Sequence, residues 1–130
     1  MSRSGLITTH FLNVDIDIRS DDSFHVFLEF LGQDIVVLGH DTQEFSFELV
    51  RNYRTAEDAV LSFSKMIKGL PQEFRDIWDQ CDNRQLNIGI QGGVEPYSSC
   101  FSLSQNAISA IAEIKCGIVF TVYGCGGAVR

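Results

Sequence analysis

Residues 11–19 alternate between apolar and polar side chains with a period of two. The apolar members are Val14, Ile16 and Ile18, and Asp15 and Asp17 stand between them. Because successive side chains of a strand point to opposite faces, this pattern predicts a strand with one side in the core and the other in water. The chain must therefore build a sheet that has a solvent-exposed polar face.

Other segments carry the helical period instead. Residues 59–70 keep apolar positions at helical spacing for three turns, and Thr55 precedes them as a capping residue. The residues between helices and strands are turn formers, such as Gly32 after the first helical segment. Further helices are predicted at three places: residues 24–31, the segment that follows Pro71, and residues 107–112.

Short apolar or alternating runs predict the remaining strands, at residues 35–38, 45–49, 86–91, 97–103 and 118–123. The order is then β-α-β-β-α-β followed by β-α-β, and its first six elements match the ferredoxin-like pattern. We expect an α+β fold: a two-layer sandwich in which one mainly antiparallel sheet carries all the strands and the helices cover one face. With 130 residues and no linker, the chain is expected to form a single domain over residues 1–130.

In the ferredoxin-like arrangement the strand of residues 11–19 lies between those of residues 45–49 and 86–91. Polar side chains of these three strands would then gather on the uncovered face of the sheet: Asp15, Asp17, Glu44, Glu48, Asn87 and Gln91. This is the most specific surface that the sequence predicts. We interpret its four carboxylates, Asp15, Asp17, Glu44 and Glu48, as partner-binding residues.

The net charge of −7 is unevenly distributed. Residues 1–48 contain nine acidic and two basic residues, whereas residues 49–130 contain eight of each, so the first part holds the whole excess. Such a surface repels nucleic acid, because phosphate binding depends on clustered lysine and arginine. It attracts a basic protein, and it also keeps a domain soluble without any partner.

Two patterns suggest catalysis, but in each case the sequence lacks the other groups that the chemistry requires. Asp15 and Asp17 share a strand face and could hold Mg²⁺ with Glu44 or Glu48, but no phosphate-binding loop or basic cluster accompanies them. The pair His40 and Asp41 lacks a nucleophile at a recognised spacing, and a turn explains it equally well. We therefore expect no catalytic residue, no metal site and no cofactor.

The four cysteines have none of the short spacings of a zinc site and are expected to be reduced thiols, with Cys125 exposed. The first residues lack the apolar core of a signal peptide, and no run approaches the ~20 apolar residues that cross a bilayer. We expect a cytoplasmic protein that contacts no membrane.

The segment Tyr97-Ser-Ser-Cys-Phe-Ser-Leu-Ser, a small-residue helix and Ile118-Val-Phe-Thr-Val-Tyr123 resemble the closing strand-helix-strand of small bacterial domain families. Some members of these families are thought to be immunity proteins of polymorphic or contact-dependent toxin systems. The resemblance covers residues 97–123 and brings no site residues with it. It implies a non-enzymatic binding protein that neutralises a basic partner such as a nuclease toxin. Two alternatives stay open: a Mg²⁺-dependent enzyme acting on phosphate esters, and a small-ligand or regulatory domain with a pocket between sheet and helices.

Overall fold

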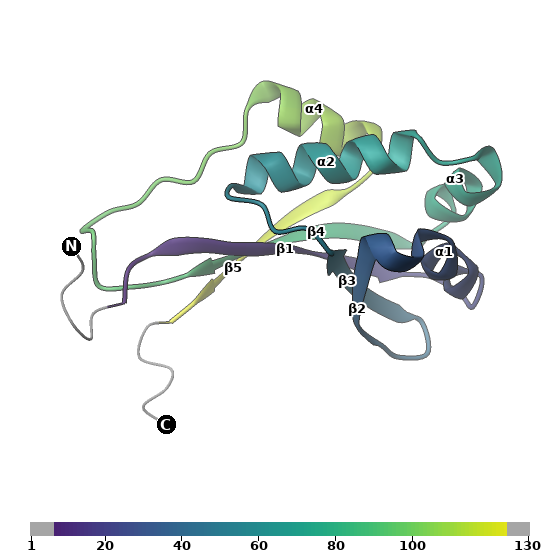
Figure 1. Ribbon diagram of the computed structural model, residues 1–130, viewed down its shortest axis with the longest axis horizontal. Coiled ribbons are helices and arrows are strands. Elements are labelled where there is room, and N and C mark those ends of the chain that lie inside the picture. Colours follow the sequence, from purple (N-terminus) through teal and green to yellow (C-terminus); the bar gives the residue numbers. More distant parts are fainter. Residues whose placement is uncertain (1–6, 125–130) are drawn as a thin grey trace.

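The structure is a computed structural model, and it describes residues 7–124. Within that range the chain is an α+β protein with one mixed five-stranded sheet and four α-helices (Figure 1). The strands are β1 (His10–Arg19), β2 (Ile35–His40), β3 (Glu44–Leu49), β4 (Asn83–Gln91) and β5 (Gly117–Tyr123). The helices are α1 (Phe24–Leu31), α2 (Ala56–Lys68), α3 (Gln72–Asp79) and α4 (Gln105–Glu113), and the short 3₁₀ turn Gly32–Asp34 follows α1.

The strands lie in the order β2-β3-β1-β4-β5. β1 is antiparallel to both β3 and β4, β2 is antiparallel to β3, and β5 is parallel to β4. The predicted position of β1 between β3 and β4 is therefore confirmed. The parallel pair requires a crossover connection, and α4 supplies it between β4 and β5.

One predicted strand is wrong. Residues 97–103 belong to the loop that joins β4 to α4, and Tyr97 and Phe101 in this loop are exposed. A strand exists only where a neighbouring strand offers unpaired backbone groups, and β4 already has β1 on one side and β5 on the other. The place beside β4 is therefore taken, and residues 97–103 pair with no strand of the sheet.

Capping residues mark two of the helices. The Thr55 hydroxyl accepts the backbone N–H of Asp58 (3.1 Å) at the start of α2, and the Ser104 hydroxyl accepts that of Ala107 (3.1 Å) at the start of α4. Helix α1 lacks a side-chain cap, and ends at Gly32, whose φ of 51° lies in the left-handed region as predicted.

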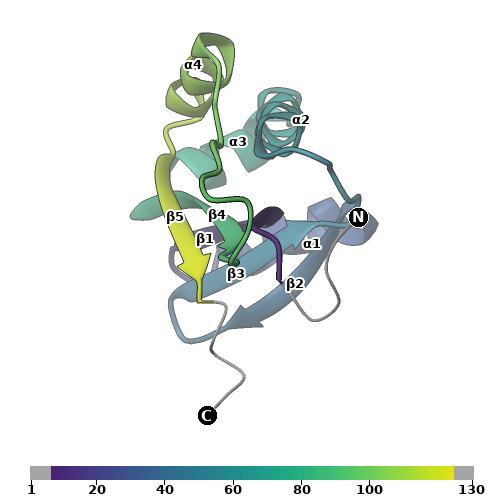
Figure 2. The same cartoon turned by 90° about the vertical axis from the view of Figure 1, so that its left-hand side faces the viewer.

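The core lies between the sheet and the helices. In Figures 1 and 2 α2 and α4 run along the same side of the sheet. Alternate strand residues are fully buried there, and the largest enclosed side chain is Trp78 of α3. Besides Trp78, the largest fully buried side chains of the core include Phe24, Phe27, Phe45, Phe47, Phe63, Ile16, Ile67, Leu86, Ile88 and Ile114.

Three cysteines fall within the described residues, and all three are free thiols. Cys81 is buried, Cys116 is partly buried and Cys100 is exposed. Burial raises the pKa of Cys81, and it raises the pKa of Cys116 to about 12, which leaves both thiols protonated and unreactive at neutral pH. The predicted exposure of Cys125 lies outside the described residues.

No helix formed by residues 7–124 combines the length and the apolar character needed to cross a membrane.

Candidate functional site: the polar face of the sheet

The strand register brings the predicted carboxylates to one face of the sheet. Asp15 lies opposite Glu48 on one side and Asn87 on the other, while Asp17 lies opposite Ser46 and Gln85. The residues between them, such as Ile16, are buried. We call this surface the polar face; its residues are Asn13, Asp15, Asp17 and Arg19 of β1, Glu44, Ser46 and Glu48 of β3, and Asn83, Gln85, Asn87 and Gln91 of β4.

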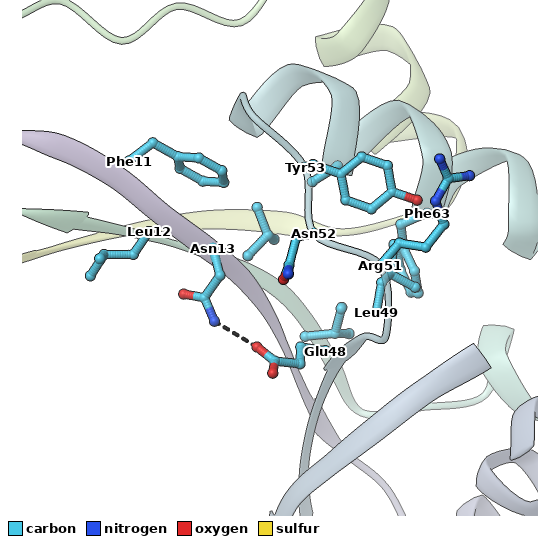
Figure 3. Close-up of a pocket in the computed structure, with 12 residues that line it drawn as sticks. Phe11, Leu12, Asn13, Glu48, Leu49, Arg51, Asn52, Tyr53 and Phe63 are labelled. Atoms are coloured by element: carbon cyan, nitrogen blue, oxygen red, sulfur yellow. Dashed lines mark hydrogen bonds between the residues drawn. The ribbon is translucent and has the colours of Figure 1, made fainter. Parts of the chain in front are cut away.

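Asp15 and Glu48 form the centre of the polar face. They are direct cross-strand neighbours, and the Asn13 amide nitrogen donates to both, to Glu48 Oε2 at 2.6 Å and to Asp15 Oδ1 at 3.0 Å. Figure 3 shows Asn13 reaching across from β1 to Glu48. A neutral amide orients the two carboxylates without neutralising either, so two negative charges remain side by side.

The crowding of charge perturbs Asp15. Partial burial raises the pKa of its carboxyl, and the charges of Glu48 and Asp17 raise the pKa further, against the hydrogen bond from Asn13. Ionised Asp15 is therefore held in an environment that disfavours its charge. A cation brought to this point would relieve the repulsion.

This repulsion predicts that Asp15→Asn stabilises the fold at neutral pH. Like charges directly opposite on a sheet cost roughly 0.2–1 kcal/mol, and solvent screening of the exposed part of Asp15 keeps the expected gain near 0.5 kcal/mol. Because folding raises the pKa of Asp15, the cost is absent below the ordinary value of 3.8 and grows as the pH rises through the raised pKa. The gain should thus shrink as urea denaturation is moved from about pH 7 towards about pH 4. Glu44→Gln is the control and should bring no gain, since Glu44 has a cationic partner.

The other two predicted carboxylates have partners of their own. Asp17 Oδ1 accepts the hydroxyl of Ser46 at 2.8 Å, and Glu44 forms an exposed ion pair with Arg19 at 2.9 Å. Glu44 and Glu48 stand at opposite ends of β3, so the four carboxylates do not form one cluster. Asp15, Asp17 and Glu48 lie together, and Glu44 lies apart beside Arg19. Sequence reasoning missed the roles of Asn13 and Arg19, although both fall on the same face of the alternating segment as Asp15.

A shallow hollow of about 490 Å³ lies at the Glu44 end of the polar face. Acidic residues outnumber the one basic residue in its wall, which contains Asp17, Arg19, Asp41, Glu44 and, from β2, His40. The remaining polar lining comes from Ser46, Asn83 and Gln85. The hollow is wide and open, which suits a side chain of a protein partner better than an enclosed small molecule.

A second cavity lies between α2 and the strands β1 and β3 (Figure 3). A small-ligand or regulatory domain, one of the two alternatives, would bind its ligand in such a place between sheet and helices. The volume of the cavity is about 30 Å³, the space of roughly one water molecule. Phe11, Tyr53 and Phe63 line it, and the guanidinium of Arg51 lies 5.7 Å from the centre of the Tyr53 ring. A cavity of this size has no room for a ligand larger than about one water molecule.

The two catalytic patterns of the sequence lie apart: Asp15 and Asp17 are on the polar face, and His40 and Asp41 are at the end of β2. No group of three or more histidine, cysteine, aspartate or glutamate residues within residues 7–124 could hold a metal ion. The Asp41 carboxylate accepts the backbone N–H of Thr42 at 2.8 Å, which is turn chemistry. The ring of His40 contacts that of His25, with centroids 5.3 Å apart, at the edge of the core beside Phe45.

Comparison of the chain with protein-family models, with curated proteins and with solved structures finds no match. The resemblance of residues 97–123 to immunity-protein families therefore stays a sequence-based prediction.

Proposed function

We propose that this domain is a non-enzymatic binding protein whose polar face receives a basic protein. The observation that carries the proposal is the uncompensated pair Asp15 and Glu48, flanked by Asp17 and bridged only by the neutral Asn13. A lysine or arginine from a partner would find two oriented carboxylates and would remove the repulsion that raises the pKa of Asp15.

The wider face supports the same proposal. Among the residues of the polar face, Arg19 alone is positively charged, and Glu44 engages it, so the field of the face is negative. Attraction of a basic partner by such a field speeds encounter and fixes orientation. An ordinary interface needs about 800 Å² from each partner, a size that three adjacent strands can supply.

We further propose a ferredoxin-like core for the first six elements, with the helices on one face of the sheet. The strand order β2-β3-β1-β4 and the antiparallel pairing of β1 with both neighbours support it. In that fold the polar face is left free for a partner.

The kind of partner that we favour is a nuclease-type toxin, which would make this domain an immunity protein acting in the cytoplasm. The support is the resemblance of residues 97–123 to such families, together with the acidic charge. Nucleases carry a basic surface because their substrate is an anion. An acidic face would compete with the nucleic acid for that basic surface.

The test measures association with a basic partner, captured from native lysate or taken as the product of the neighbouring gene. Reversing Asp15, Asp17, Glu44 and Glu48 to Lys should slow association at least tenfold at low salt, and the rate for the unchanged protein should fall as salt rises. The matched control reverses four exposed acids outside the polar face, Asp22, Glu29, Asp34 and Glu73, and changes the net charge equally. The control should keep most of the rate.

Circular dichroism must show that both quadruple variants stay folded, as expected for exposed and half-exposed positions. Equal association rates for the two variants would contradict the proposal and would leave the carboxylates a role in solubility alone.

A further inference from the structure

Within residues 7–124, the outer edge of β5 has no pairing strand. Among the described residues β5 pairs only with β4, and its seven residues, Gly117–Tyr123, keep an unbroken register and include no charge and no proline. Natural sheet edges usually carry a charge, a proline or a bulge that prevents pairing with another strand. β5 lacks all three, so its outer edge is open to pairing with a further strand.

The side chains of β5 support this reading. Ile118, Phe120 and Val122 lie opposite the buried residues Leu86, Ile88 and Ile90 of β4, so they point to the core side of the sheet. They nevertheless stay exposed, Phe120 to 52%, because α4 does not cover them. The core side of the sheet thus extends, uncovered, to the edge of the molecule.

Helix α4 extends this apolar surface from β5 into the helix layer. Glu113 contacts Lys68 of α2, and Ile108 lies about 140° around the helix from Glu113, at 100° per residue, on the flank away from α2. Figure 2 shows that flank above β5. Ile108 is exposed, and we call the surface that it forms with Ile118, Phe120 and Val122 the β5 wall.

We propose that the β5 wall is the interface of a homodimer, in which two copies of β5 pair antiparallel and join two five-stranded sheets into one. A two-fold axis between identical strands makes them antiparallel and makes the contact self-complementary. An axis at Phe120 overlaps all seven residues and sets Ile118 against Val122 of the second copy and Phe120 against itself. Each of the three apolar side chains that β5 contributes then meets another apolar side chain.

The charges around the two outer edges of the sheet favour pairing of two copies through β5 over pairing through β2. β2 (Ile35–His40) is itself uncharged, like β5, but Asp34 and Asp41 flank it and the acidic excess of residues 1–48 surrounds it, so two copies that approached through β2 would bring carboxylates near each other. Residues 49–130 are balanced in charge, and β5 is uncharged. The register of β2 also shifts between Val37 and Gly39, which interrupts its edge.

The size of the wall fits a reversible dimer. Seven residues span about 23 Å at 3.3 Å each, and a helix layer on a sheet layer is about 20 Å high, so the flat area is roughly 450 Å². Two copies would then bury roughly 900 Å² in total, below the ~1,200–2,000 Å² of a standard interface and in the range of weak, transient complexes. We expect a dissociation constant of the order of 10 µM, as for interfaces at the small end of the range.

Sedimentation velocity from about 1 µM to about 1 mM tests the dimer. The unchanged protein should shift from monomer to twice the monomer mass. Phe120→Lys, which puts two like charges face to face on the axis, should stay monomeric throughout. Val37→Lys is the matched control, because Val37 is an exposed apolar residue (47%) on the opposite edge, and this variant should still dimerise.

A cysteine scan tests the register, in a background with Cys100 and Cys125 changed to Ser. Phe120→Cys should form an intermolecular disulfide in air, since residues directly opposite lie about 4.5–5.5 Å apart at Cα, within disulfide range. Val122→Cys should not, because the two copies of residue 122 would be about 13 Å apart along the strands. A protein that is monomeric at every concentration, or a dimer that survives Phe120→Lys, would overturn the proposal. Neither result bears on the polar face, which lies on other strands.

Discussion

Trp78→Ala is expected to lower the free energy of unfolding by about 4 kcal/mol, the largest effect of any single change considered. The Trp78 indole is fully buried where α3 meets the core, stacked on Phe27 (centroids 5.7 Å apart) and edge-on to Phe63 (5.6 Å). Its Nε1–H donates to the carbonyl of Ile114 at 2.8 Å, at the C-terminal end of α4. Truncation would therefore leave a cavity and an unpaired buried carbonyl together.

Trp78→Phe separates these two losses. The phenyl ring fills much of the space but cannot donate, so the unpaired carbonyl of Ile114 should cost roughly 1–3 kcal/mol. Urea denaturation gives both values, with the midpoint for Trp78→Ala falling by about 2 M if the slope stays near 2 kcal/mol/M. If Trp78→Phe proved as damaging as Trp78→Ala, the hydrogen bond and not the packing would hold the C-terminal end of α4 in place.

The elements that sequence could predict are those with a strong internal period. Alternation located β1 and β4, and the helical spacing after Thr55 located α2, because each pattern needs only one buried face. Residues 97–103 show why local alternation is insufficient. Whether an extended segment becomes a strand depends on a free sheet edge, and β5, which comes later in the chain, occupies the place beside β4.

The sequence allowed the strand order to be predicted, and only those features of the candidate site that depend on strand order could be predicted with it. Knowing that β1 lies between β3 and β4 places Asp15 near Glu48, but the register that makes them direct neighbours depends on tertiary packing. The separation of Glu44 from this pair follows from the same register. The Asn13 bridge depends on side-chain reach across strands, which no sequence pattern encodes.

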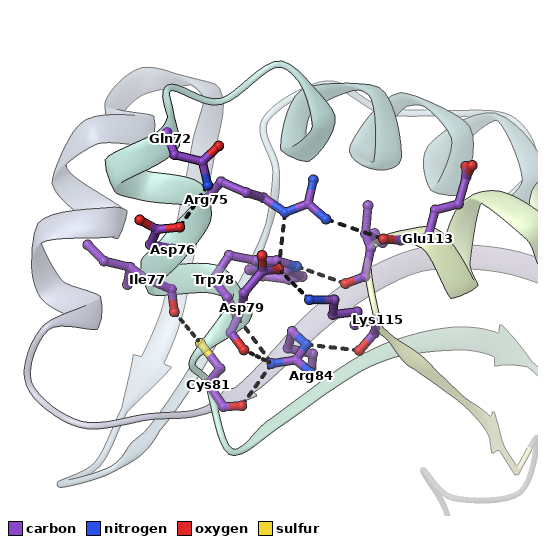
Figure 4. A network of polar contacts seen from close by, with 11 residues as sticks. Gln72, Arg75, Asp76, Ile77, Trp78, Asp79, Cys81, Arg84, Glu113 and Lys115 are labelled. Carbon is purple, nitrogen blue, oxygen red and sulfur yellow. Dashed lines mark hydrogen bonds and ion pairs between the residues drawn. The ribbon is translucent and has the colours of Figure 1, made fainter.

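Arg84 connects three elements near the C-terminal end of α3 (Figure 4). From β4 its Nη1 donates to the carbonyls of Cys81 (2.8 Å) and Trp78 (3.1 Å), more weakly to that of Asp79 (3.4 Å), and its Nε donates to the carbonyl of Lys115 (2.9 Å). Trp78 and Asp79 belong to the last turn of α3, and the Trp78 carbonyl also accepts the backbone N–H of Cys81 (3.2 Å), so Arg84 adds a charged donor to this end of the helix. Lys115 lies between α4 and β5 in the left-handed region, with a φ of 63°. One guanidinium thus links the end of α3 to the turn into β5.

Arg84→Met is expected to destabilise the fold by about 2–3 kcal/mol, because it removes the charged donor from several partly buried carbonyls and keeps the aliphatic stem. Arg84→Lys should recover only part of this loss, since a single ammonium cannot reach the Lys115 carbonyl and the end of α3 together. The control is Arg19→Met: this arginine also stands at a strand end, but its ion pair with Glu44 is exposed, so the cost should stay within about 0.5 kcal/mol. Thermal denaturation should show a Tm drop of about 10 °C for Arg84→Met and about 2 °C or less for Arg19→Met. Equal drops would mean that Arg84 acts as an ordinary surface charge and that the last turn of α3 is stabilised by water.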